Sequence, residues 1–306
     1  MQQQPISIFI GMDPRERAAT NVLIDSLVDT SSAPLAITPL VTPQLEQQKL
    51  YWRQRDPKQS TAFSFTRFLV PQLMGFQGWA IFMDCDMLCR ADISDLWALR
   101  DERFAVMCVQ HDHQPTEASK FLGETQSAYP KKNWSSLMLL NCSRCQALTP
   151  EYVNSASGLD LHRFHWLDGD HQIGALPNRW NHLVGVQEPA SEEAALLHWT
   201  LGGPWFREQR SMGGAVAAEW FGARDDAMAL WDERITPPPW LPFRLGWNQA
   251  DCPANCSPMW AAGHYCSGCW SAASKLNTQP LLCSAPIAKN SAPRPANGPY
   301  RGLCLC

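Results

Sequence analysis

The opening of the chain constrains its fold most, because an apolar segment leads directly into the start of a helix. Residues 6–11 read ISIFIG, and a run this short and this apolar predicts a strand that is buried on both faces. Asp13 and Pro14 follow, a pair typical of the first turn of a helix, and apolar residues then recur at helical spacing to Leu27. A buried strand followed by an amphipathic helix is the first unit of an α/β fold.

Later segments continue this pattern. Residues 61–74 predict a helix with apolar side chains on one face. Further strands are predicted at 35–40, 79–83, 104–109, 136–140, 183–186 and 195–197. The sequence TPPP at 236–239 then interrupts regular structure. We therefore expect one α/β domain of Rossmann-like organisation over residues 1–236.

Residues 237–306 differ sharply in composition. Seven of the 12 cysteines lie after residue 240, but only one of the 29 acidic residues does, Asp251. Cysteine pairs at 252/256 and 266/269 have roughly the spacing of a zinc ribbon, although the segment shows no hydrophobic periodicity. We expect a poorly ordered tail rich in Cys, Trp and Pro. A zinc site and a tail translated from a shifted reading frame stay open as alternatives.

Charge and hydropathy exclude some classes of function. The net charge of −4 gives no basic surface for nucleic acid, so no nucleic-acid partner is expected. No run of about 18 apolar residues predicts a transmembrane segment. The N-terminal residues lack the charged start and cleavage site of a secretory signal. We expect a cytoplasmic protein, with peripheral association with an inner membrane as the alternative.

An acidic pair follows the apolar segment 79–83. Ligands of open α/β sheets bind beyond the carboxyl ends of the strands, where this segment delivers Asp84 and Asp86. Alternate residues of an extended chain point the same way, so the two carboxylates can converge on one point. Like charges this close repel unless a cation lies between them, and oxygen ligands suit Mg²⁺ or Mn²⁺. The pair alone also fits a turn cap.

The acidic pair also fits a second class of enzyme. Phosphatases of the haloacid-dehalogenase type carry Asp-x-Asp after a strand, which would make Asp84 the nucleophile. Against this interpretation, Leu88 stands where that motif usually has Thr or Val, and one or two predicted strands precede the pair. A nucleotide-sugar-binding protein without turnover is a third hypothesis.

Several motifs in order resemble glycosyltransferase family 8. Residues 65–73 read FTRFLVPQL, residues 79–88 read WAIFMDCDML and residues 92–97 read DISDLW. Three later segments are also similar to family motifs: NWSSLMLLN at 133–141, WLDGDHQIG with LPNRWN at 166–181, and HWTLGGPW at 198–205. The resemblance covers roughly residues 6–210. It implies a GT-A fold and metal-dependent transfer of a hexose from a nucleotide-diphosphate sugar to an unknown glycan, lipid or small-molecule acceptor with retention. A UDP-sugar is the expected donor.

The resemblance also implies roles for particular residues. The metal ligands would be Asp84, Asp86 and His198, holding Mn²⁺ or Mg²⁺. The donor would be bound by Gly11, Asp13, Arg67, Ser136, Gly202 and Gly203. Asp170 and Gln172 would be the catalytic residues, near the reacting anomeric carbon or the acceptor.

Two motifs depart from the family pattern. Residues 198–205 lack the Lys that the family places before Pro-Trp. Either the backbone N–H groups of Gly202 and Gly203 serve the phosphate in its place, or the phosphate is bound less tightly. His171 stands between Asp170 and Gln172, which leaves open which side chain faces the sugar.

Overall fold

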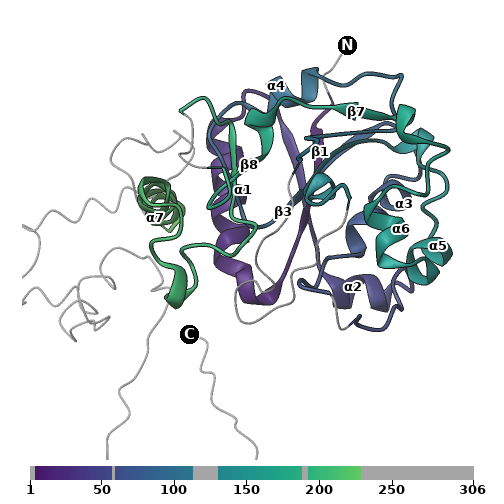
Figure 1. Ribbon diagram of the computed structural model, residues 1–306, viewed down its shortest axis with the longest axis horizontal. Coiled ribbons are helices and arrows are strands. Elements are labelled where there is room, and N and C mark those ends of the chain that lie inside the picture. The colour runs from purple at the N-terminus through teal and green to yellow at the C-terminus, as the bar shows by residue number, and fades with distance from the viewer. Residues whose placement is uncertain (1–3, 57–58, 113–129, 188–191, 229–306) are drawn as a thin grey trace, which may run out of the picture. The chain divides into compact units, whose positions relative to one another are not determined.

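The structure is a computed structural model that describes residues 4–56, 59–112, 130–187 and 192–228. The predicted tail lies outside these residues, so its lack of order stays a prediction. Within the described residues, strands form two sheets, and helices pack beside them (Figure 1). The predicted mixture of helices and strands is confirmed.

The larger sheet has six strands in the order β2-β1-β3-β6-β5-β7. Strand β1 runs parallel to both β2 and β3, as expected for the opening α/β unit, whereas β6 runs antiparallel to β3 and to β5. The sheet is therefore mixed. Its strands are β1 (Ile6–Gly11), β2 (Leu35–Leu40), β3 (Trp79–Asp84), β5 (Val106–Cys108), β6 (Leu137–Asn141) and β7 (Ile173–Ala175).

The smaller sheet has three strands in the order β4-β9-β8. They are β4 (Met87–Cys89), β8 (His182–Leu183) and β9 (Leu196–His198). Strand β4 begins only three residues after β3 ends, and it pairs antiparallel with β9. The chain thus passes from the large sheet into the small one through the acidic pair.

The α-helices pack beside the sheets, and all except α7 lie between strands in the chain. They are α1 (Arg17–Thr30), α2 (Thr42–Gln47), α3 (Val70–Leu73), α4 (Ile93–Ala98), α5 (Pro150–Ser155), α6 (Gly158–His162) and α7 (Ala215–Ala227). Short 3-10 turns lie at η1 (Pro14–Glu16), η2 (Thr66–Leu69), η4 (Trp134–Ser136), η5 (Cys142–Arg144), η6 (Asp170–Gln172), η7 (Asn178–Asn181) and η8 (Arg207–Gln209). None of the described helices is long and apolar enough to cross a membrane.

The predicted helix over residues 61–74 is wrong in its first half. Side-chain hydroxyls fold the segment before Thr66, where the oxygens of Thr61 and Ser64 lie 3.0 Å apart and Ser64 also donates to the Thr61 carbonyl. Such local bonds compete with helix formation. The helical part splits into η2 and α3, with Pro71 in the first turn of α3, where its missing N–H costs nothing.

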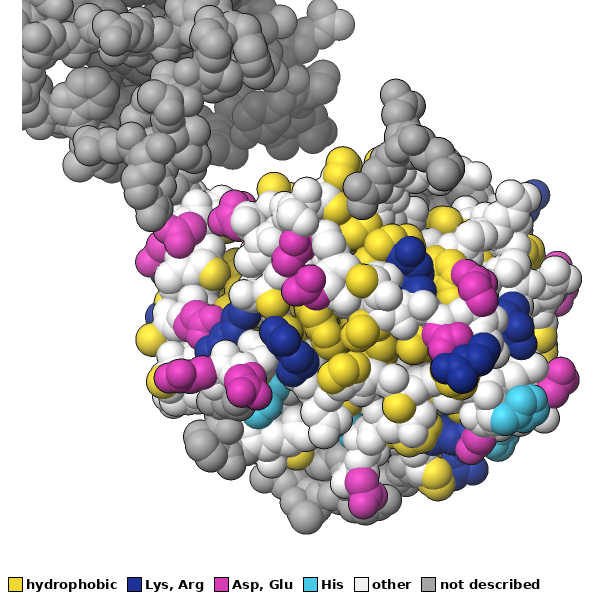
Figure 2. Space-filling model, turned by 90° about the horizontal axis from the view of Figure 1, so that it is seen from above, with side chains coloured by type: hydrophobic (Ala, Val, Ile, Leu, Met, Phe, Trp, Pro, Cys, Tyr) yellow, Lys and Arg dark blue, Asp and Glu magenta, His cyan; other side chains and the backbone are white. Residues whose placement is uncertain are grey.

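The core sits between the larger sheet and its helices. All residues of β6 and five of the six residues of β3 are buried, as expected for continuous apolar runs. On the face that Figure 2 shows, acidic and basic side chains alternate around a central apolar band. The described part of that face therefore has no extended region of purely positive or purely negative charge.

Candidate metal and nucleotide site

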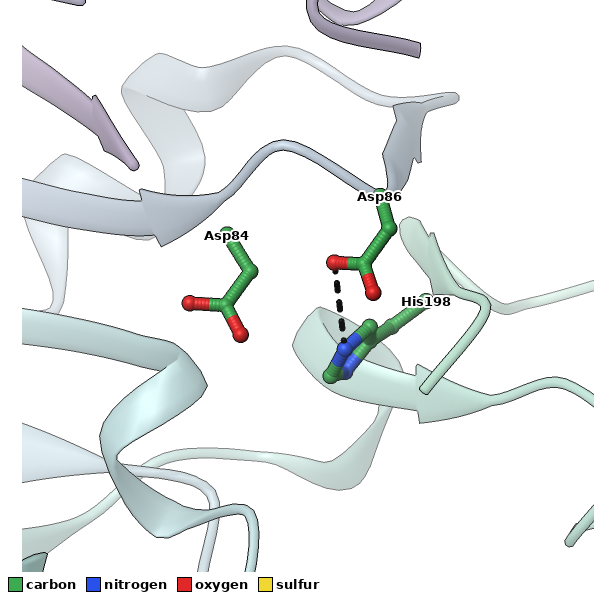
Figure 3. Close-up of side chains that lie close together, drawn as sticks. All are labelled: Asp84, Asp86 and His198. Carbon is green, nitrogen blue, oxygen red and sulfur yellow. Dashed lines mark ion pairs between the residues drawn. The ribbon is translucent and has the colours of Figure 1, made fainter. Parts of the chain in front are cut away.

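Three predicted ligands come together where the two sheets meet. One ligand atom each from Asp84, Asp86 and His198 lies within 4.8 Å of the others (Figure 3). Their residues are 9%, 6% and 1% exposed, so the cluster is nearly enclosed by protein. This spacing matches what one small cation requires of its ligands.

Strand register explains the convergence. Asp84 is the last residue of β3 and pairs with Gly11 at the carboxyl end of the parallel strand β1. Asp86 immediately precedes β4, whose first residue, Met87, pairs with His198 at the end of β9. In addition, the Trp199 N–H donates to the Asp86 carbonyl at 2.9 Å. Backbone pairing therefore places an imidazole opposite a carboxylate 112 positions earlier in the chain.

A directed chain of hydrogen bonds orients the His198 ring. Ser136 Oγ donates to the Asn133 carbonyl, 2.6 Å away, so it must accept from Asn181 Nδ2 at 2.9 Å. The Asn181 amide thereby turns its oxygen toward His198 Nδ1, 2.9 Å away, and that nitrogen donates. The neutral ring then presents the lone pair of Nε2 to the carboxylates. Metal-binding histidines are commonly held by such a partner on the other nitrogen.

The residues present fit a divalent cation. His198 Nε2 lies 3.4 Å from Asp86 Oδ1. That oxygen is buried and accepts no hydrogen bond from the described residues. A lone pair facing a buried carboxylate oxygen is unfavourable unless a proton or a metal ion lies between them. Two carboxylates and one imidazole form a donor set suited to Mn²⁺.

Arg67 is buried against this cluster. Its Nη1 lies 2.8 Å from Asp84 Oδ1 and donates to the Ser135 carbonyl at 2.8 Å. The guanidinium lies 5.2 Å and 5.0 Å from the ring centres of Phe63 and Phe82. Arg67 therefore holds one ligand carboxylate and offsets its charge, in addition to lining the pocket that the resemblance assigned to the donor.

A pocket of about 310 Å³ opens over the three ligands. Ser136 is one of the residues that line it, and its role at the donor stays a prediction. The other lining residues are Asp56, Gln59, Ser60, Thr61, Ser64, Phe65, Arg67, Asp84, Asp86, Lys132, Asn133, Ser135, Ser157, Gly158, Leu159, His162, His198 and Thr200. Hydroxyl, amide and charged groups dominate this wall, as expected for a polar ligand.

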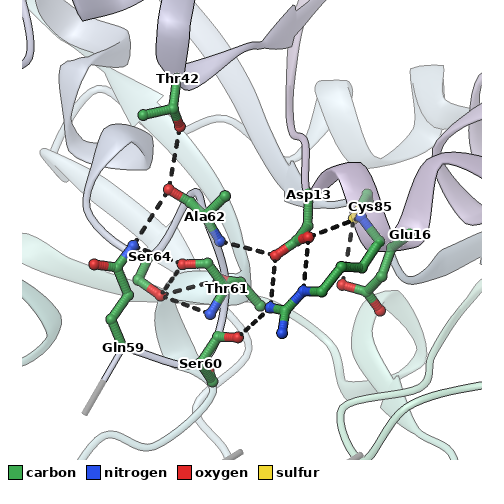
Figure 4. A network of polar contacts seen from close by, with 10 residues as sticks. Asp13, Glu16, Thr42, Gln59, Ser60, Thr61, Ala62, Ser64 and Cys85 are labelled. Atoms are coloured by element: carbon green, nitrogen blue, oxygen red, sulfur yellow. Dashed lines mark hydrogen bonds and ion pairs between the residues drawn. The ribbon is translucent and has the colours of Figure 1, made fainter. Parts of the chain in front are cut away.

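Gly11 and Asp13 lie behind the wall rather than in it. A Cβ at Gly11 would come within 2.3 Å of the Phe63 ring, so a glycine is needed here to let the backbone pass this close to the ring. Asp13 accepts from the Ala62 N–H at 2.9 Å and binds Arg15, which donates to the Ser60 carbonyl (Figure 4). Burial raises the pKa of Asp13, but the bonds from Arg15 and Ala62 outweigh it and lower the pKa below its ordinary value. Asp13 therefore holds in place the segment that carries the pocket-lining residues Ser60 and Thr61.

The predicted catalytic pair is not part of the pocket lining. Asp170 and Gln172 lie in η6, where the Asp170 side chain is 76% exposed and pairs with Lys131. The Gln172 carbonyl accepts from Ala105 at 3.0 Å. Their placement does not support a role at the anomeric carbon, and that role stays a prediction.

Gly202 and Gly203, which follow β9, lie outside the pocket wall. The Gly202 N–H donates to the Trp199 carbonyl at 2.8 Å, so it is engaged within the protein. A Cβ at Gly203 would come within 2.3 Å of the Trp205 ring, which shows that this glycine allows tight aromatic packing. Neither glycine lines the pocket, and the phosphate role expected for them stays a prediction.

Cys85 lies between the two acidic ligands but is not itself a ligand. Its thiol points to the other side, 3.9 Å from Glu16 Oε2 (Figure 4). Burial, followed by the nearby Glu16 carboxylate, raises the pKa of this thiol well above its ordinary value. The protonated form of the thiol is therefore favoured at this position.

Sequence reasoning missed most of the lining and supporting residues, among them Lys132, His162, Asn181 and Thr200. His162 Nδ1 lies 2.8 Å from Ser135 Oγ, next to the carbonyl that Arg67 binds. Asn181 and Thr200 stood inside motifs that carried the resemblance, which was the one signal available for them. The sequence held no signal that would separate Lys132 from its neighbour Lys131.

Comparisons with known proteins bear on the family of this chain. The profile described as Glycosyl transferase family 8 matches residues 26–152. Protein CDI of Arabidopsis thaliana is 46% identical over 211 residues, which make up 67% of this chain and 81% of that protein. This identity and coverage establish membership of a common family.

Solved structures of similar arrangement include two glycosyltransferases. The apo form of GlyE from Streptococcus pneumoniae is 14% identical, with a TM-score of 0.49 over 75% of this chain and 61% of GlyE. The galactosyltransferase LgtC, in complex with donor and acceptor sugar analogues, is 12% identical, with a TM-score of 0.48 over 74% of this chain and 98% of LgtC. Because both TM-scores are below 0.5, these structures carry no argument, and the family assignment rests on the sequence matches.

Proposed function

The chain belongs to glycosyltransferase family 8, and from this premise we propose that it transfers a hexose from a nucleotide-diphosphate sugar, with UDP-hexose as the donor class. The acceptor is a glycan, lipid or small molecule, and the anomeric configuration is retained. The observation that carries the proposal is the convergence of Asp84, Asp86 and His198 beneath a polar pocket. This cluster suits a divalent cation that bridges protein and diphosphate.

The protein's part in the reaction follows from the geometry. Asp84, Asp86 and His198 would hold Mn²⁺ or Mg²⁺, which when bound supplies positive charge to the departing diphosphate. Arg67 keeps the Asp84 carboxylate oriented, and Asn181 keeps His198 Nδ1 protonated so that Nε2 faces the site. The carboxylates are nearly enclosed, and charge interactions are stronger there than in open water.

The pocket wall provides groups for the rest of the donor. Ser64, Ser135 and Thr200 contribute hydroxyls, and Asn133 contributes an amide. Such groups can satisfy sugar and ribose hydroxyls, which lose water when they enter a pocket. We further propose a cytoplasmic location, supported by the five described cysteines, all free and buried. Cell fractionation with a tagged protein tests this location directly.

A donor screen by thermal shift, with and without Mn²⁺, tests the proposed function. A ligand that binds only the native state raises its melting temperature, so one nucleotide-sugar should stabilise the protein in a metal-dependent manner. Absence of a response to every nucleotide-sugar would refute the proposal. Release of phosphate from simple esters, with an aspartyl-phosphate trapped at Asp84, would point instead to the phosphatase.

Substitution of a ligand sharpens the test. Asp86→Asn should abolish Mn²⁺-dependent donor turnover and preserve the fold, because Asp86 Oδ1 makes no hydrogen bond to the described residues that could be lost. Asp95→Asn, on the exposed side of α4, is the matched control and should keep full activity. Donor binding by the wild type without hydrolysis or transfer would identify a binding protein rather than an enzyme.

A further inference from the structure

We propose that Ser135 and His162 form a proton relay that deprotonates the acceptor hydroxyl during transfer. The sequence motifs assign neither residue a part in proton transfer. The inference rests on the proposed function, because it names groups that act on the acceptor in the same pocket. Ser135 contacts the acceptor, and His162 acts through Ser135.

The hydroxyl of Ser135 is bonded to an imidazole in the pocket wall. Ser135 Oγ lies 2.8 Å from His162 Nδ1, and both residues line the pocket together with the three metal ligands. Ser135 is 4% exposed, and its hydroxyl has no other hydrogen-bond partner among the described residues. A serine hydroxyl that donates to a neutral imidazole can pass on its proton, as general-base catalysis requires.

Two other lining hydroxyls have amide partners instead. Ser136 Oγ donates to the Asn133 carbonyl at 2.6 Å, and Thr200 Oγ1 donates to Asn133 Oδ1 at 3.3 Å. An amide oxygen does not take up a proton near neutral pH, whereas an imidazole does. The partner of Ser135 is therefore the one suited to proton transfer.

The described wall contains two imidazoles, and only one of them is committed to the metal site. His198 donates from Nδ1 to Asn181 and turns Nε2 toward Asp86. Asp56 also lines the wall, but a carboxylate is ordinarily a weaker base than an imidazole. His162 is accordingly the group that we assign as the base.

Aromatic contacts hold the His162 ring in place. The centre of the ring lies 5.3 Å from that of Phe68, edge to face, and 6.0 Å from that of Phe65. His162 is also the last residue of α6, so its backbone is fixed by the helix. A ring packed against two neighbours cannot turn freely, and Nδ1 stays directed at the serine hydroxyl.

The backbone of Ser135 is linked to the metal site. Its carbonyl accepts from Arg67 Nη1 at 2.8 Å, and the same nitrogen lies 2.8 Å from Asp84 Oδ1. The next residue, Ser136, belongs to the hydrogen-bonded chain that ends on His198 Nδ1. The acceptor must reach the carbon bonded to the diphosphate, which these ligands would position through the cation. A hydroxyl linked to two of the three ligands is suitably placed to meet the acceptor.

The relay carries one proton from the acceptor to solvent. The acceptor oxygen bonds to the anomeric carbon as the bond from that carbon to the diphosphate oxygen breaks, and the electron pair leaves with the diphosphate. The acceptor proton moves to Ser135 Oγ, and the serine proton moves to His162 Nδ1. The imidazolium then releases its proton to water, to which His162 is partly exposed. Water can replace the acceptor, so hydrolysis of the donor should use the same relay.

Hydrolysis of UDP-glucose and of UDP-galactose with Mn²⁺ tests the relay, with azide as a second nucleophile. His162→Gln should slow hydrolysis about 10²- to 10⁴-fold, the usual contribution of a general base. Azide has no proton to lose, so it should restore donor cleavage by His162→Gln, with a glycosyl azide detected by mass spectrometry. His165→Gln is the matched control, because the His165 side chain is 52% exposed, and it should keep the wild-type rate.

Ser135→Ala covers the case in which His162→Gln does not fold. It removes the hydroxyl and leaves the backbone carbonyl that Arg67 binds. It should slow hydrolysis and respond to azide as His162→Gln does. The double variant should be no slower than the slower single variant, because the two groups act as a unit.

Three results would overturn the relay. Hydrolysis by His162→Gln at the wild-type rate, or a loss that azide does not restore, would show that His162 is not a base. Azide rescue of Asp56→Asn in place of His162→Gln would move the base to Asp56. In each case the wild type still cleaves a UDP-hexose and the proposed function stands, whereas a wild type that cleaves neither donor refutes both proposals.

Discussion

Replacing Arg67 with Met removes the buried cation from Asp84 and preserves much of the apolar contact with the two flanking rings. Breaking a fully buried ion pair costs about 3–5 kcal/mol, because the remaining charge stays in a poorly solvated place. Here the Arg67 and Asp84 side chains are 6% and 13% exposed, and the carboxylate borders an open pocket. We therefore expect the lower end of that range, about 3 kcal/mol.

The assay is urea unfolding followed by tryptophan fluorescence, with EDTA to exclude metal ions. Arg90→Met is the matched control, because Arg90 pairs with Glu219 where the side chains are 21% and 38% exposed. Pairs this accessible to water contribute less than about 1 kcal/mol. The reasoning is refuted if Arg67→Met destabilises the protein no more than the control does.

Mn²⁺ provides a second readout of the same substitution. Without Arg67, the Asp84 carboxylate has lost its cation and gains more from a metal ion. Because ligand binding to the native state adds stability, Mn²⁺ should raise the melting temperature of Arg67→Met more than that of the wild type. An equal or smaller rise would show that Asp84 does not take part in metal binding.

Three further predictions follow from other contacts. Asn181→Leu should weaken Mn²⁺ binding about 10- to 100-fold in a calorimetric titration, because the ligand imidazole loses its orienting partner; unchanged affinity would contradict this. Hydrogen bonds from Ser32 lower the pKa of Asp92 from 3.8 to about 2, so Asp92→Ala should destabilise the protein by about 1 kcal/mol at pH 7. Because the pKa of Asp92 is lower in the folded state, the difference in unfolding free energy between the wild type and Asp92→Ala is complete above about pH 4 and should vanish as the pH falls through 2. A difference that does not change with pH would refute a stabilising role for the ionised Asp92 carboxylate. Gly11→Ala should cost about 1–3 kcal/mol in thermal unfolding, because the new Cβ meets the buried Phe63 ring, whereas Gly222→Ala has no atom within 4 Å and should not destabilise.

Much of the fold could be predicted because burial leaves a local pattern in the chain. Strands β1, β2 and β3 correspond to apolar runs, and α1 to an apolar repeat of helical period. The short strands β4 and β7 were missed, whereas β5 and β9, which are equally short, were found because they overlap apolar stretches of the sequence. Residues 61–64 were predicted as helix because local hydroxyl bonds leave no trace in hydrophobic spacing.

The sequence by itself determined the α/β organisation, the acidic pair at a strand end and the family. These features depend on residues close together in the chain or on the order of motifs along it, and both can be read directly from the sequence. Tertiary structure alone decided the contacts that make the site work: the ion pair of Arg67 with Asp84 and the amide of Asn181 on His198. A hydrogen bond or ion pair needs atoms within about 3 Å, and only the register of the sheets and the φ values of the loops set such distances.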